Sequence, residues 1–199
     1  MAALGARQQS ASAPPASETE DVLRVDWSRR SPISTRNALL SVLNRFGHID
    51  EAVVLLCPSL ERGLLHELSY ETVERAVDSW IKGTLFLLKG VLDLYRNRSA
   101  QGQPVLALVD LADQEEGTAF PPLEAALRGS FEATARSLIS SYDGESLRVQ
   151  VFSGFDPQLK GFAEFIVQTL SGRTPRAAGR WHRFPPKSGL LGNLKIPRG

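Results

Sequence analysis

Two side chains of opposite charge, Glu124 and Arg128, stand four residues apart in a segment with helical periodicity. At this spacing the two side chains meet on one face of a helix. A glutamate can act as a general base, but a neighbouring arginine lowers its pKa and makes it a poor proton donor near neutral pH. Pairs of this kind are usually solvated and stabilise a helix by a few tenths of a kcal/mol. The spacing therefore favours a structural, solvated pair over an acid–base couple.

The other reactive side chains form no recognisable site in the sequence. Cys57 follows an apolar run, and no histidine is obviously placed to activate it as a nucleophile. His48, His66 and His182 are far apart and lack the spacing of metal ligands, so no metal site is predicted. Ser137 lies in a helical segment without the pattern of a nucleophile elbow.

Composition sets limits on the class of protein. The chain has 199 residues, enough for one domain with a full core, and a net charge of +1, which gives no overall electrostatic case for binding nucleic acid. A single cysteine fits a reducing compartment, and we expect the cytoplasm. No apolar run approaches the roughly 20 residues of a membrane span. Residues 1–20 are rich in Ala, Ser and Pro and are predicted to be a disordered tail, with a weak resemblance to an organelle transit peptide as the alternative.

Strands and helices alternate from residue 21 onward. Proline and serine mark helix starts, and valine-rich apolar runs mark buried strands. The predicted strands are 22–25, 52–56, 104–109 and 147–152, and the predicted helices are 32–46, 69–98, 121–142 and 157–172. This alternation predicts an α/β fold with a parallel sheet and right-handed crossovers, spanning residues 21–172. Residues 173–199, with scattered prolines and several basic residues, are predicted to be an irregular basic tail.

The segment 69–98 is the longest predicted helix. Ser69 is a suitable N-cap, and apolar residues recur at the i, i+3, i+4, i+7 spacing of a helix packed on a core. Leu87 and Leu94 lie off this main stripe and widen the apolar face. A wide apolar face on a long helix often contacts a second partner.

Several stretches, in order, resemble the short-chain dehydrogenase/reductase (SDR) family. In that family a helix ending in Phe-Gly-x-Ile-Asp precedes the fourth strand of a Rossmann sheet, and Asp-Val-Asn-Leu-Lys-Gly-Thr opens the long fourth helix. The stretches of this chain that carry the resemblance, within 22–181, are 45–50 (RFGHID), 78–84 (DSWIKGT), 129–139 and 147–154. The resemblance implies an incomplete Rossmann-like three-layer sandwich with about four parallel strands.

The sequence departs from the family at the cofactor site. The family begins with a strand and a glycine-rich turn that presents helix N–H groups to the dinucleotide pyrophosphate. No such pattern and no strand are predicted before Val22, so the first strand, first helix and second strand of the family fold look absent. Asp26 stands where the family often has an aspartate near the adenine, although it is also an ordinary turn residue. We therefore expect no NAD or NADP cofactor.

The catalytic positions of the family are also changed. The family uses a serine, a tyrosine, a lysine four residues later and a supporting asparagine. Aligned on the resemblance, the tyrosine and lysine positions hold Glu124 and Arg128, the serine position falls at or near Leu111, and the asparagine position holds Trp80. The resemblance therefore implies a degenerate member that has lost hydride-transfer chemistry.

The resulting hypothesis is a non-catalytic SDR-like protein, a structural or regulatory pseudoenzyme subunit. It is expected to form a homodimer, or to pair with a related SDR subunit, through helices 69–98 and 121–142. The predicted interface residues are Trp80, Leu87, Leu94 and Phe131. One alternative is an NAD(P)-dependent short-chain oxidoreductase whose N-terminal cofactor-binding part is missing from this chain. A second is a binder of nucleic acid or an anionic surface through the basic tail.

The resemblance also carries a prediction about strand order. Residues 22–25 correspond by position to the family's third strand, which the first and second strands separate from the fourth. With those strands absent, we expect 22–25 to move inward and pair directly with 52–56 within one chain, giving a sheet of about four strands. The alternative is that a partner chain supplies the missing strands.

Overall fold

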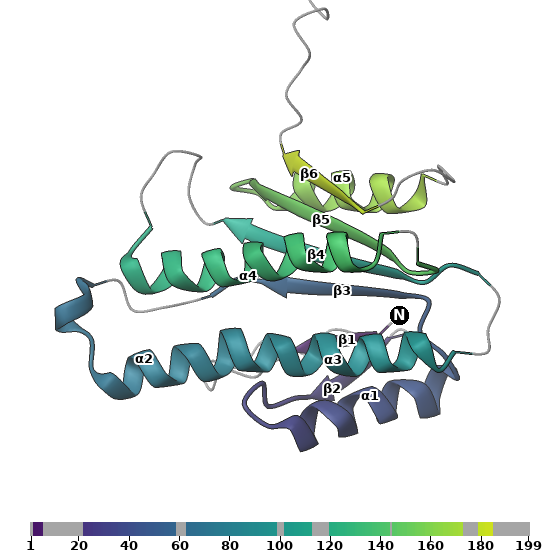
Figure 1. Ribbon diagram of the computed structural model, residues 1–199, viewed down its shortest axis with the longest axis horizontal. Helices are drawn as coiled ribbons and strands as arrows, with labels where there is room; N and C mark the ends of the chain where they lie inside the picture. Colours follow the sequence, from purple (N-terminus) through teal and green to yellow (C-terminus); the bar gives the residue numbers. More distant parts are fainter. Residues whose placement is uncertain are drawn as a thin grey trace, which may run out of the picture.

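The structure is a computed structural model that describes residues 2–5, 22–58, 63–98, 102–112, 120–143, 145–172 and 179–184 (Figure 1). In chain order its elements are β1 (Ala2–Gly5), β2 (Leu23–Asp26), α1 (Pro32–Phe46), β3 (Glu51–Leu56), η1 (Leu65–Glu67), α2 (Tyr70–Ala76), η2 (Val77–Lys82), α3 (Gly83–Arg96), β4 (Val105–Ala112), α4 (Pro122–Ser141), β5 (Arg148–Phe155), α5 (Lys160–Ser171) and β6 (Arg180–Phe184).

The main sheet has four parallel strands in the order β3-β4-β5-β6. Strand β4 is buried on both faces, which explains its unbroken apolar run. Leu106 and Leu108 pack toward α3 and α4, while Ala107 and Val109 pack toward Phe162 of α5. Helices therefore cover both faces of the sheet, and the predicted three-layer α/β architecture with four parallel strands is confirmed (Figure 1).

The predicted position of strand 22–25 is wrong. Strand β2 pairs in parallel with β1, with Leu4 opposite Val25, and these two strands form a separate two-stranded sheet. Residues 2–5, predicted as part of a disordered tail, are therefore a strand, and the rest of segment 1–20 lies outside the described residues. A four-residue strand pairs through its backbone, which hydropathy patterns do not detect. Among the described residues, the edge of β3 away from β4 has no partner strand.

The ordered domain extends beyond the predicted limit at residue 172. Strand β6 pairs with β5, and its aromatic side chains explain why it joins the sheet: the ring of His182 stacks on Phe152 at 4.9 Å, and the ring of Phe184 lies 5.4 Å from that of Phe162. A Cβ at Gly154 would come within 2.6 Å of the Phe184 carbonyl oxygen, so β5 needs a glycine there. The rest of the predicted basic tail lies outside the described residues.

The predicted long helix is continuous but changes its winding. Ser69 caps it as expected, because its hydroxyl accepts a hydrogen bond from the Thr72 N–H at 3.1 Å. Between α2 and α3 the segment η2 is π-helical, and the Gly83 N–H donates to the Asp78 carbonyl five residues earlier. Such π turns are rare and often occur at functional sites. None of the helices in the described ranges is long and apolar enough to cross a membrane.

Candidate functional site

A cluster of side chains around one arginine, Arg128, lies where the carboxyl end of β4 meets the beginning of α4. Arg128 Nε donates to Glu124 Oε1 at 2.8 Å, and its Nη1 atom pairs with Asp110 Oδ1. Its Nη2 atom donates to the Leu111 carbonyl oxygen at 3.2 Å, and its guanidinium carbon lies 4.4 Å from the centre of the Phe120 ring. We call this set of five residues the Arg128 cluster.

Local structure explains how these residues meet. Pro121 and Pro122 begin α4 and place Glu124 in its first turn, where a carboxylate is favoured by the helix dipole. One turn later Arg128 faces the same side of the helix. Asp110 ends the apolar run of β4, opposite Leu56 on one side and Ser153 on the other.

The cluster is largely removed from solvent. The side chains of Arg128, Glu124 and Asp110 are 8%, 5% and 21% exposed. Burial raises the pKa of the Asp110 carboxyl above its ordinary value, although the Arg128 guanidinium acts in the opposite direction. One cation thus faces two carboxylates in a poorly hydrated place, and each carboxylate depends on it for compensation.

The structure of this cluster differs in two ways from what the sequence predicts. The Glu124–Arg128 pair was expected to be solvated, but both residues are buried, because β4 and the Phe120 ring close over the helix face that carries them. Asp110 and Phe120 were not singled out in the sequence. A carboxylate that ends a buried strand was the available signal for Asp110, since ligand sites of parallel sheets lie at the carboxyl ends of strands.

Three of the four positions aligned with the family's catalytic residues come together. Leu111, Glu124 and Arg128 belong to the Arg128 cluster, and Leu111 takes part through its backbone carbonyl. Trp80 does not: it lies in η2, where its ring packs beside Leu123 and Leu127 and contacts the Arg29 guanidinium. In chemical terms, three nitrogens of Arg128 donate hydrogen bonds to two carboxylates and one backbone carbonyl, and the guanidinium also contacts an aromatic ring.

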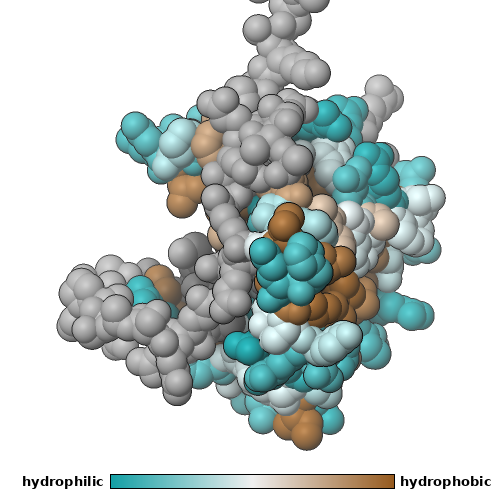
Figure 2. Space-filling view, turned by 90° about the vertical axis from the view of Figure 1, so that its left-hand side faces the viewer, coloured by the Kyte–Doolittle hydropathy of each residue, from teal (hydrophilic) through white to brown (hydrophobic). Residues whose placement is uncertain are grey.

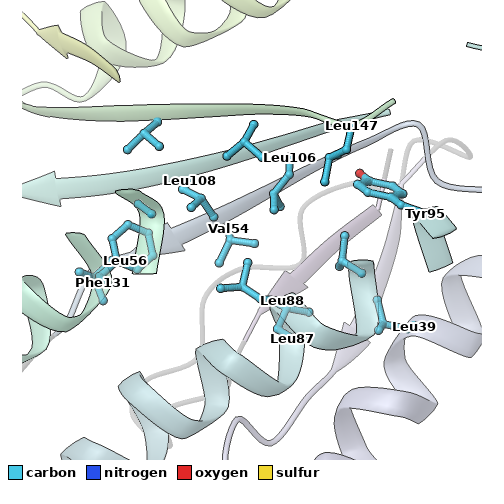
Figure 3. Packing of buried hydrophobic residues seen from close by; sticks show 14 of the residues in the cluster. Leu39, Val54, Leu56, Leu87, Leu88, Tyr95, Leu106, Leu108, Phe131 and Leu147 are labelled. Carbon is cyan, nitrogen blue, oxygen red and sulfur yellow. The ribbon is translucent and has the colours of Figure 1, made fainter. Parts of the chain in front are cut away.

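The predicted interface residues occupy different environments. Leu87 and Phe131 are buried in the core (Figure 3). Leu94 is partly buried and packs against this core. Leu87 is covered because α1 lies against α3, so closely that a Cβ at Gly90 would come within 2.5 Å of Leu39 Cδ1. Leu87 and Phe131 are therefore not on the outer surface of these helices.

A groove nevertheless runs along the outer side of α3 and α4. Its volume is about 290 Å³, and it is lined by Leu85, Leu88, Lys89, Leu92, Asp93, Arg96, Thr134, Leu138 and Tyr142. Its lining combines apolar side chains with the charged side chains of Lys89, Asp93 and Arg96, and Leu85 is 46% exposed.

The β2–α1 connection lacks the feature by which dinucleotide sites hold the pyrophosphate. A dinucleotide site needs a glycine-rich turn that leads from a strand into a helix N-terminus. The β2–α1 connection instead reads Trp-Ser-Arg-Arg-Ser and continues into α1 through Pro32. Asp26, the candidate for adenine contact, is exposed at the end of β2. In the described part of the chain, no group of His, Cys, Asp and Glu is placed to hold a metal ion.

The Arg128 cluster lies toward the end of the molecule to which β3 and β4 point (Figure 1). Figure 2 looks onto that end and shows apolar atoms gathered between polar ones. Cys57, which follows β3, is exposed.

Comparison with known proteins gives a fold but no close relative. No protein-family model and no curated protein matches the sequence. Among solved structures, a protein described as a short-chain dehydrogenase/reductase from Burkholderia xenovorans is similar with a TM-score of 0.64 and 16% identity, over 81% of this chain and 74% of that one.

Two further similar structures are reductases. One is an NADH-dependent reductase of alginate metabolism, with a TM-score of 0.59 and 14% identity, over 68% of this chain and 56% of that one. The other is the 3-ketoacyl-(acyl-carrier-protein) reductase of Brucella melitensis complexed with NADH, with a TM-score of 0.58 and 16% identity, over 67% of this chain and 56% of that one. The chain thus spans little more than half the length of these reductases. It has a Rossmann-like α/β fold of the short-chain dehydrogenase/reductase type.

Proposed function

We propose that this chain is a non-catalytic protein of SDR-like fold that acts as a structural or regulatory subunit. The observation that carries the proposal is the Arg128 cluster. An acid–base catalyst needs a group within reach of substrate that can give and take a proton near neutral pH. Glu124 and Arg128 are instead buried against each other, and Arg128 is fully occupied by partners.

The partner surface in this proposal is the groove between α3 and α4. Protein interfaces usually combine an apolar centre with a polar rim, and the lining of this groove holds side chains of both kinds. A second copy of the chain, or a related SDR-fold subunit, would cover the groove with the same pair of helices. Because Leu87 and Phe131 are buried, the interface would use the groove residues Leu85, Leu92 and Leu138 in their place.

Light scattering coupled to size exclusion tests the assembly. Leu85→Asp should lower the mass of the wild-type assembly, because it places a charge in the groove. Leu40→Asp is the matched control, since Leu40 is similarly exposed at 43% but lies on α1. A wild-type chain that stays monomeric at tens of micromolar, and that captures no SDR-fold subunit, would contradict the proposed role.

A second candidate is an NAD(P)-dependent oxidoreductase of which this chain is a part. It is favoured by the similar structures, which include reductases complexed with NAD or NADH and a short-chain dehydrogenase in complex with NADP. Isothermal titration with NADH and NADPH separates the two candidates. The non-catalytic proposal expects no submillimolar affinity, because the described residues supply no cradle for the pyrophosphate. Micromolar affinity would instead support the oxidoreductase.

A further inference from the structure

Arg29 occupies an unusual position in the connection between β2 and α1. Its backbone lies against the junction of η2 and α3, where a Cβ at Gly83 would come within 2.6 Å of the Arg29 carbonyl oxygen. The connection is fixed by the Trp27 indole N–H, which donates to Thr35 Oγ1 at 2.9 Å, and by Ser28, whose N–H donates to Ser34 Oγ at 2.9 Å. The backbone that carries Arg29 is therefore held in place from both sides.

Two tryptophan rings hold the Arg29 side chain. Its guanidinium carbon lies 4.1 Å from the centre of the Trp80 ring and 5.1 Å from that of Trp27. The π turn of η2 carries Trp80, so the change of winding in the long helix lies at this contact. Cation–π contacts engage the face of a guanidinium, so the two rings do not satisfy its N–H donors, which lie in its plane.

Those donors lack acceptors within the described chain. The Nε atom of Arg29 is buried and has no hydrogen-bond partner, and no described carboxylate lies within ion-pair distance of the guanidinium. Burial lowers the pKa of Arg29 below its ordinary value, with only an exposed cysteine, Cys57, acting against the shift. The Arg128 cluster is the opposite case, in which one arginine has two carboxylates. A partly buried guanidinium without an anion is costly unless a ligand supplies one.

The surroundings favour a negative ligand. Arg30 follows directly and is exposed, and α1 begins at Pro32 without any acidic residue in its first turn, so the exposed Asp26 at the end of β2 is the one carboxylate in this connection. The positive end of this helix therefore adds to the two arginines. Arg29 also follows the carboxyl end of β2, and ligands of parallel α/β sheets bind beyond the carboxyl ends of strands.

We propose that Arg29, held by Trp27 and Trp80, binds the oxyanion group of a small molecule, either a phosphate or a carboxylate. Both groups present two oxygens in a plane that matches the in-plane N–H donors of a guanidinium. This site lies apart from the Arg128 cluster and from the α3–α4 groove, and it does not depend on the proposed subunit role.

Titration with pyrophosphate and, separately, with succinate tests the proposal at constant ionic strength. Tryptophan fluorescence reports on Trp27 and Trp80, and the Nε–H resonance of Arg29 in ¹⁵N-labelled protein reports on the state of its guanidinium. We expect a saturable response to one of the two probes, and the probe that works identifies the ligand as a phosphate or a carboxylate. Arg29→Met should weaken binding about tenfold or more, as for loss of a charge-assisted hydrogen bond.

Arg36→Met is the matched control, because it removes an exposed cation of α1 that is not part of the proposed site. Its affinity should stay within about twofold of wild type, since an exposed charge is largely screened. Arg29→Lys keeps the charge but loses the planar donors, and it should bind less tightly than wild type even if Arg29→Met does not fold. A lack of saturation with both probes, an unchanged Arg29 Nε–H resonance, or equal losses in the two methionine variants would overturn the proposal.

Discussion

Helix α4 carries the same ion pair twice, and the two copies differ only in their surroundings. Glu124–Arg128 and Glu132–Arg136 have the same residues in the same order at the same spacing. In the first pair the glutamate and arginine side chains are 5% and 8% exposed, whereas in the second they are 48% and 62% exposed. Arg136 contacts the Trp181 ring at 4.9 Å, but Arg128 adds Asp110, a carbonyl oxygen and Phe120.

The contribution of an ion pair to stability therefore depends on how far its surroundings exclude water. An exposed pair gains little, because water competes with each partner and screens the charges. A buried pair is also weak evidence for net stability, but its members become dependent on each other. Removing one member of a buried pair leaves a charge that neither water nor protein compensates. Replacing one charged member of the Arg128 cluster should therefore destabilise the folded protein.

The largest difference in the free energy of unfolding is expected between the variants that lack one or the other arginine of the two pairs. Arg128→Met leaves Glu124 and Asp110 buried without a cation and should lower the free energy of unfolding by about 3–5 kcal/mol. Arg136→Met loses an exposed pair and a ring contact, and should cost at most about 1 kcal/mol. Urea unfolding of both variants measures the difference. Equal losses would show that the cluster is hydrated in solution.

Replacing the two glutamates should give a smaller difference in the free energy of unfolding, again with the larger loss at the buried pair. Glu124→Gln keeps the shape of the side chain but leaves Arg128 with Asp110 as its one carboxylate, and should cost about 1–3 kcal/mol. Glu132→Gln should cost about 0.2–0.5 kcal/mol, the usual worth of such a helix pair. Chemical denaturation with matched m-values checks both. A Glu124→Gln variant as stable as wild type would mean that Asp110 alone compensates Arg128.

The pH dependence of stability should carry the signature of Asp110. Because its pKa is raised in the folded state, the folded protein holds this proton more tightly than the unfolded chain does. Its contribution is therefore full at low pH and is lost as pH rises from about 4, the unfolded value, through the folded pKa. Subtracting the unfolding free energies of Asp110→Asn from those of wild type, point by point between pH 3 and 7, isolates this effect. A difference that grows with pH would contradict the assigned direction.

The smallest expected effect is a difference between the two ion pairs in how their contribution to the free energy of unfolding depends on salt. In about 1 M sodium chloride the Debye length falls to about 3 Å, so the few tenths of a kcal/mol from Glu132–Arg136 should disappear. The cost of Glu124→Gln should persist, because the buried groups are poorly screened. Repeating the two unfolding experiments at low and high salt provides the measurement, and an equal response of both variants would rule out a difference in hydration.

The alternation of strands and helices, the parallel sheet and the Ser69 cap were predictable, because they depend on local pattern. Strand β1 was not, because Ala2–Gly5 is too short to show a period and is recognised only through its pairing with β2. The burial of Glu124 depends on β4 lying across the helix, which spacing along α4 cannot reveal. The contact between Arg29 and Trp80 depends on a π turn, whose extra residue a regular 3.6-residue period does not contain.

The free edge of β3 has a consequence for handling the protein. Within the described chain this strand reads Glu-Ala-Val-Val-Leu-Leu, with Val53 and Leu55 each 50% exposed and no partner strand on one side. An apolar edge strand without proline or lysine is a template for cross-β pairing between molecules. Concentrated solutions are therefore at risk of aggregation through β3, and a lysine in place of Val53 is the substitution by which natural edge strands avoid it.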